Sequence, residues 1–206
     1  MGKVMLWSSR HAKLVIAVII ALSAIAAFFA VQVRIDSGTE GMMIEGDPAK
    51  DFHRDTVAKF GSDNVTVVFV RDKNLFTPEK LKVLENLYYD LKDLPGVERA
   101  ESLFSVTNFK GVGGALETNP LMDRAPDTLE EAQRIKTDAL RSPLFINSLI
   151  SSDGEMTAVN LYVDVDKKDP EFHTKFSKKV DAVAGKYEKQ FDRLFQFGNS
   201  FSRRAI

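Results

Sequence analysis

The chain has 206 residues, of which 28 are basic and 29 acidic, so its net charge is −1 at pH 7. This balance provides no strongly basic surface for nucleic acid, and no nucleic-acid partner is expected. Because the chain contains no cysteine, disulfides, thiolate nucleophiles and Cys-ligated zinc sites are excluded. Beyond an apolar N-terminal segment, the length suffices for one ordinary globular domain.

An apolar segment over residues 14–33 carries no charge and, at about 30 Å, is long enough to cross a bilayer as a helix. Lys3, Arg10 and Lys13 precede it, so the positive-inside rule predicts a cytoplasmic N-terminus over 1–13. The alternative is a cleavable signal peptide, because Ala24-Ile25-Ala26 has the small-x-small form of a cleavage site. The length of the apolar run favours a retained transmembrane helix.

Residues 34–198 then alternate between helical and strand patterns. Asp47 and Pro48 open a helix that ends at Phe60, and an apolar, β-branched run over 65–70 predicts a buried strand. A second helix begins at Thr77 and Pro78 and closes before Pro95-Gly96. A strand over 97–106 is expected to follow, and then a glycine-rich surface loop over 107–124.

The second half of this region repeats the alternation. The capping-box spacing of Asp127 and Glu130 predicts a helix that ends near Arg141. Asp153-Gly154 predicts a hairpin turn between arms at 148–151 and 157–165. A helix from Asp169 with apolar residues on one stripe, and a last strand over 194–197, complete the pattern.

This order of elements predicts an α+β fold: one N-terminal transmembrane helix followed by a split β-α-β, ferredoxin-like domain with an insertion. We expect the strands that contain Val67, Val163 and Phe195 to share one sheet, because both β-α-β units must bury an apolar helix stripe. Two helices would cover one face of that sheet. Its other face would be free to pack on a neighbour, and we expect it to be apolar.

The chain as a whole resembles the resistance-nodulation-division superfamily of transporters. Within it, the resemblance is to the branch of hydrophobe and amphiphile exporters that includes the mycobacterial-type membrane large proteins and the hopanoid transporters. The residues that carry the resemblance, besides the N-terminal helix, are Gly46-Asp47-Pro48, Phe60-Gly61, Leu94-Pro95-Gly96-Val97, Ser102-Leu103, Ser142-Pro143-Leu144 and the run from Leu149 to Gly154.

The resemblance implies a proton-driven exporter of lipids or other hydrophobic or amphiphilic molecules in the bacterial inner membrane, with residues 34–198 as its first, periplasmic porter subdomain. Its partners would be the bilayer, the cargo, and the transporter's other porter subdomains and transmembrane helices. Residues 199–206 would begin the return toward a second transmembrane helix. The family's proton-relay residues lie in later helices, so none is assigned to a position here.

No constellation in the sequence supports catalysis, a cofactor or a metal, and an enzyme is not expected. Asp164, Asp166 and Asp169 lack the spacing of a calcium loop, and no serine lies in a G-x-S-x-G elbow. The expected contribution to function is a surface for substrate. Four apolar residues in or near the glycine-rich insertion are the candidates, because residues of a surface insertion are not expected to be buried in the core: Phe104, Phe109, Leu116 and Leu121.

A second function belongs to a different class. The chain could be a self-contained, single-pass anchored module whose exterior domain recruits a periplasmic partner. A stop codon directly after Ile206 would favour that module, and another apolar run would favour the transporter.

Overall fold

A computed structural model describes residues 7, 10–30, 46–61, 64–112, 115–165, 169 and 171–204. The chain forms two compact units, Met1–Asp55 and Thr56–Ile206, and each is described on its own.

The first unit contains the apolar helix α2, Ala12–Ala30, whose 19 residues span about 28 Å. None of these residues is buried, and by length and composition the helix could cross a membrane. A signal sequence has the same properties, so the helix is a candidate for either. The predicted helix is confirmed from Leu14 to Ala30, and residues 31–33 lie outside the described part of the chain.

Helix α4, Pro48–Phe60, begins and ends as its sequence predicts. The Ala49 N–H donates to Asp47 Oδ1 at 2.8 Å and so caps the first turn. At the other end, the Gly61 N–H donates to the carbonyl of Val57, and Gly61 has a φ of +91° that favours glycine.

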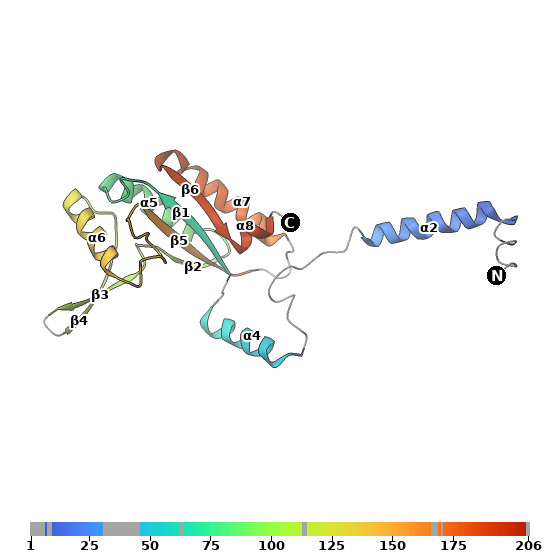
Figure 1. Cartoon of the computed structure of the whole chain (residues 1–206), viewed down its shortest axis with the longest axis horizontal. Helices are drawn as coiled ribbons and strands as arrows, with labels where there is room; N and C mark the ends of the chain where they lie inside the picture. Colours follow the sequence, from blue (N-terminus) through green and yellow to red (C-terminus); the bar gives the residue numbers. More distant parts are fainter. Residues whose placement is uncertain are drawn as a thin grey trace. The chain divides into compact units, whose positions relative to one another are not determined.

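The second unit is built on a four-stranded sheet with the strand order β2-β5-β1-β6, in which all neighbours are antiparallel. The strands are β1 Val65–Arg71, β2 Val97–Glu101, β5 Met156–Val163 and β6 Arg193–Gly198. Helix α5, Pro78–Lys92, joins β1 to β2 along the chain, and helix α7, Phe172–Gly185, is part of the connection from β5 to β6 (Figure 1). The prediction that β1, β5 and β6 share one sheet is confirmed.

One face of this sheet and the two helices form the core. In β1, Thr66, Val68 and Val70 are buried and alternate with half-buried residues, as expected for a strand with two different faces. The fully buried side chains of α5 and α7 pack on the same apolar cluster: Leu81, Leu84, Leu87, Leu91, Phe176 and Val180. Helix α7 ends at Gly185, and the 3-10 turn Glu188–Gln190 and helix α8, Asn199–Arg204, flank β6.

The strand predicted over 97–106 is shorter than expected, because β2 ends at Glu101. The Ser102 N–H donates to Ser105 Oγ at 2.8 Å, and the Phe104 N–H donates to Ser102 Oγ at 3.1 Å. These serine hydroxyls satisfy local backbone groups and replace the hydrogen bonds of a strand ladder.

The surface loop predicted over 107–124 is wrong for most of its length. Strands β3, Thr107–Val112, and β4, Ala115–Pro120, pair antiparallel and form a separate two-stranded sheet. Gly111 lies within β3, and residues 113–114 are outside the described part of the chain. Glycine suits a hairpin turn as well as a loop, so its presence did not distinguish the two.

Helix α6, Leu129–Arg141, is confirmed, with its cap shifted by one residue. Thr128 Oγ1 accepts from the Glu131 N–H at 3.3 Å, so Thr128 rather than Asp127 is the N-cap. The expected hairpin arm over 148–151 forms no regular strand, but Ile150 bridges to Thr157 and to Ile146, and the Ala158 N–H donates to the Leu149 carbonyl at 3.0 Å. The turn at Gly154 forms as predicted, with a φ of +69°.

Candidate functional site

The sheet of the second unit has a second face, which no described helix of that unit covers. The antiparallel register places alternate residues of the four strands on it, because cross-strand partners share a face. Ala158 of β5 is buried, and we call the other residues the exposed sheet face: Val65, Val67, Phe69 and Arg71 of β1, Met156, Asn160 and Tyr162 of β5, Arg193, Phe195 and Phe197 of β6, and Arg99 and Glu101 of β2.

The half of this face formed by β1 and β6 is aromatic. Phe69 and Phe195 are directly opposite in the register, and their rings stack with centroids 5.3 Å apart. Phe195 is 39 % exposed and Phe197 is 60 % exposed. The Arg193 guanidinium lies 5.2 Å from the centre of the Phe195 ring, within reach of a cation–π interaction. The expected apolar free face is therefore present in this half.

The half formed by β2 and β5 is polar, unlike the expectation for the face as a whole. The Tyr162 hydroxyl donates to Glu101 Oε2 at 2.9 Å, and Arg99 forms an ion pair with the same carboxylate. The Arg99 guanidinium also lies 3.9 Å from the centre of the Tyr162 ring. Burial is the main cause that raises the pKa of Tyr162 above its ordinary value, and the neighbouring Glu101 carboxylate raises it further. The phenol therefore stays protonated at neutral pH.

The four predicted substrate-surface residues do not form one surface. Phe104 is only 8 % exposed and stacks on Tyr88 with ring centroids 5.9 Å apart, and Leu121 is 7 % exposed within the same apolar cluster. The expectation that Phe104 and Leu121 lie outside the core is wrong, because the turn after β2 and the end of β4 both pack against it. Phe109 is 53 % exposed on β3, and the side chain of Leu116 lies outside the described residues. Whether any of the four contacts a substrate stays a prediction.

A groove of about 550 Å³ lies between the hairpin and α6, close to the predicted residues. Its lining is mainly polar and charged and includes Asn108, Arg124, Glu131, Arg134 and Asp138. Leu121, one of the predicted residues, also lines it. Because apolar ligands favour pockets with mostly apolar walls, this groove suits a polar ligand better than an apolar one.

The aromatic half of the exposed sheet face was not predicted as a site from the sequence. The alternation of Phe195, Gln196 and Phe197 was visible and predicted a strand, but it did not show which neighbour would bring a third ring alongside. Phe69 lies more than a hundred residues earlier in the chain, and only the strand order places it against Phe195.

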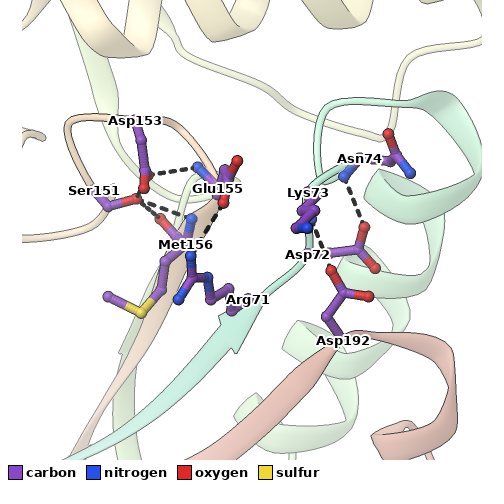
Figure 2. Close-up of polar contacts among 9 residues, drawn as sticks. All are labelled: Arg71, Asp72, Lys73, Asn74, Ser151, Asp153, Glu155, Met156 and Asp192. Atoms are coloured by element: carbon purple, nitrogen blue, oxygen red, sulfur yellow. Dashed lines mark hydrogen bonds and ion pairs between the residues drawn. The ribbon is translucent and has the colours of Figure 1, made fainter.

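Polar residues gather where β1 ends, and Figure 2 shows two groups of them. In the first group, Asp72 Oδ1 accepts from the Asn74 N–H at 2.8 Å, and Asp192 Oδ2 accepts from the Lys73 N–H at 3.1 Å. Asp72 is buried, and Lys80 Nζ lies 2.6 Å from its Oδ2. These carboxylates therefore hold the turn that leads from β1 to α5.

The second group in Figure 2 forms the turn before β5. Asp153 accepts from the Ser151 hydroxyl and from the Glu155 N–H, and the Met156 N–H donates to Ser151 Oγ at 2.9 Å. Glu155 also pairs with Arg71 at 3.2 Å, which ties this turn to the end of β1. Every one of these polar groups has a structural role in closing the sheet.

The Asp153 carboxylate provides a test of this turn. The Ser151 hydroxyl, then the Glu155 N–H, lower the pKa of Asp153 below its ordinary value of 3.8. The stability that Asp153 contributes is therefore present above pH 3.8 and is lost as the pH falls through its lower, folded-state pKa. Ser151→Ala should raise the pKa of Asp153 toward 3.8, as measured by NMR titration of the side-chain carboxyl. Ser148→Ala is the control, and a pKa that stays unmoved in Ser151→Ala would contradict the assignment.

Among the described residues, no three His, Asp or Glu side chains converge as a metal site would require. Asp169 accepts from Lys175 Nζ at 2.9 Å and from the Glu171 N–H at 3.0 Å, which is the chemistry of a helix start. The hydrogen bond from Lys175 is the main cause that lowers the pKa of Asp169, and the hydrogen bond from the Glu171 N–H is the second. Asp166 lies outside the described residues.

No protein-family model matches this chain, and no curated protein is detectably similar to it. The resemblance to the resistance-nodulation-division superfamily therefore stays a prediction from the residues quoted for it. The geometry of the exposed sheet face is the basis for the proposals below.

Proposed function

We propose that the chain is the membrane-anchored first part of a proton-driven exporter of lipids or other hydrophobic or amphiphilic molecules, of the resistance-nodulation-division type. In this proposal α2 crosses the bacterial inner membrane with Lys3, Arg10 and Lys13 in the cytoplasm. The Thr56–Ile206 unit then works in the periplasm beside the other porter subdomains and transmembrane helices of the transporter.

We also infer that the sheet has the ferredoxin-like, split β-α-β arrangement. The strand order supports this inference, since β5 lies between β1 and β2, which are themselves joined through α5. The second β-α-β unit, β5-α7-β6, places its last strand on the far side of β1. The β3-β4 hairpin and α6 are then the insertion between the two units.

The observation that carries the proposed function is the aromatic half of the exposed sheet face. A soluble domain normally buries phenylalanine rings. Phe195 and Phe197 lie on the same face of β6 and are both exposed, which indicates a contact surface. The polar half formed by Tyr162, Arg99 and Glu101 lies next to it on the same sheet. A surface with an apolar and a polar half suits a molecule that itself has both.

Proton coupling is assigned in this proposal to other parts of the transporter. The apolar run over 14–33 contains no ionisable side chain that could relay a proton across the bilayer. The chain would therefore contribute an anchor and a substrate surface, and no catalysis.

The proposal is tested in cells that produce the complete gene product. The double variant Phe195→Ser, Phe197→Ser should slow the efflux of a preloaded lipophilic fluorescent dye several-fold, because it removes the exposed rings that hold apolar cargo. The amount of transporter in the membrane, measured by immunoblotting, should stay unchanged.

The matched control is Leu144→Ser, since Leu144 is 64 % exposed but follows α6 in the chain and belongs to none of the four strands of the sheet. Its efflux should equal that of the parent protein. Equal efflux in the double variant and the parent would contradict the proposal. In that case the anchored module that recruits a periplasmic partner becomes the better hypothesis.

A further inference from the structure

The outer edge of β6 is a second feature of the molecule that is suited to binding a partner, in this case another strand. β6 is an edge strand of the four-stranded sheet, with β1 on one side only. An edge strand presents backbone donors and acceptors that another strand can pair with.

The register shows which backbone groups point outward. The Val163 N–H donates to the Asn64 carbonyl and the Asp72 N–H to the Glu155 carbonyl, each at 2.9 Å. Even-numbered residues of β1 therefore face β5 with their backbone groups, and odd-numbered residues face β6. On β6, the partners of those odd residues are Arg193, Phe195 and Phe197.

It follows that the N–H and C=O groups of Leu194 and Gln196 point away from the sheet. In the part of the chain that the structure describes, no hydrogen bond to these outward groups is present. A groove of about 240 Å³ runs beside them, lined by Leu194 and Gln196 and, from α7, by Asp181, Ala184 and Gly185. The small residues of α7 leave room there for the side chains of another strand.

The opposite edge of the sheet is protected in the usual ways. The pairing of β2 with β5 is irregular between Val97 and Arg99, as in a β-bulge, and Arg99 and Glu101 place charges along this edge. β6 has no proline, and its register with β1 is unbroken. The fold therefore blocks one edge and leaves the other suited to pairing.

We propose that β6 pairs antiparallel with β6 of a second copy of this chain, so that two sheets become one continuous sheet. In the best register, Gln196 lies opposite Gln196 of the second copy, and Phe195 lies opposite Phe197 of the second copy. These aromatic pairs occupy non-hydrogen-bonded positions, where Cα atoms are about 4.5 Å apart and side chains are closest.

The side chains select a second copy as the occupant. In this register all four rings of the two β6 strands pair across the interface, and aromatic cross-strand pairs stabilise a sheet. Arg193 lies beyond the end of the second copy's β6 at Gly198, so no two arginines face each other. The outward groups of Gln196 hydrogen-bond to their own equivalents, which only a two-fold arrangement provides. The pairing goes beyond the proposed export and does not depend on it.

The absence of cysteine makes a direct test possible. Two copies of the full chain with different affinity tags, one Phe195→Cys and one Phe197→Cys, are produced together and oxidised in membranes with copper phenanthroline. The mixed disulfide should form in several-fold excess over disulfides between two identical variants. No mixed disulfide, or a main product joining two Phe195→Cys copies, would overturn the proposal.

Two further variants separate pairing from random collision and from misfolding. Copies with Arg99→Cys, on the opposite edge, should give no more disulfide than collision produces, and an equal yield there would overturn the proposal. Leu194→Pro removes only an outward N–H, so the full chain in detergent should become monomeric by light scattering while its circular dichroism spectrum is retained. Leu194→Val keeps the N–H and should remain dimeric. These readouts do not involve dye efflux, so their failure is distinct from failure of the proposed function.

Discussion

Lys80→Met is expected to destabilise the Thr56–Ile206 unit by about 3–5 kcal/mol, because it leaves a buried carboxylate without its cation. Lys80 Nζ lies 2.6 Å from Asp72 Oδ2, the Asp72 side chain is only 3 % exposed, and Lys80 also donates to the Gln190 carbonyl. The measurement is chemical denaturation of the full chain in detergent, followed by circular dichroism.

The control for this variant is Lys186→Met, because Lys186 pairs with Asp90 at 3.4 Å and both side chains are largely exposed. Its cost should be no more than about 1 kcal/mol. The double variant Asp72→Asn, Lys80→Met should recover part of the loss, since the remaining amide carries no charge. A loss below about 1 kcal/mol in Lys80→Met would show that the ion pair does not stabilise the fold.

Gly198→Ala is expected to lower the free energy of unfolding by about 2–5 kcal/mol. The new Cβ would collide with backbone, and the backbone conformation at this position is strained for any residue except glycine. Gly198 has a φ of +127°, and a Cβ placed there would lie 2.5 Å from the carbonyl oxygen of Val65. That oxygen belongs to the neighbouring strand and cannot move without disturbing the sheet. The same denaturation measurement gives the loss.

The matched control is Gly185→Ala at the end of α7, where a Cβ would meet nothing within 4 Å. This variant should be neutral or stabilise the unit by up to about 1 kcal/mol, because alanine has less conformational freedom to lose on folding. Equal effects of the two substitutions would contradict the role assigned to Gly198.

Local chemistry was enough to predict most elements of this fold. Thr77 and Pro78 mark the start of α5 whatever surrounds them, and the alternation from Val159 to Val163 identifies β5. The errors fell where the same residues suit two structures. Gly111, Gly113 and Gly114 are typical of a loop and equally of a hairpin. Ser102 and Ser105 end β2 through side-chain hydrogen bonds to the backbone that the sequence pattern does not reveal.

The candidate site was less predictable because it depends on which strands become neighbours. Phe104 and Leu121 lie next to glycine-rich sequence, and only the packing of Tyr88 against that turn shows that they are core. Phe69 and Phe195 each look like one ring of an ordinary strand. They form a candidate contact surface only because their rings stack between neighbouring strands, and the sequence pattern does not show which strands are neighbours.

The position of β5 between β1 and β2 also governs when the domain can fold. Val68 pairs with Val159, about 90 residues later, so the central strand pair closes a very long loop. Until β5 has emerged, β1, α5 and β2 have no strand between them to pair with, and their apolar faces stay open. During synthesis, β1 and α5 therefore remain without their central strand until β5 has been made.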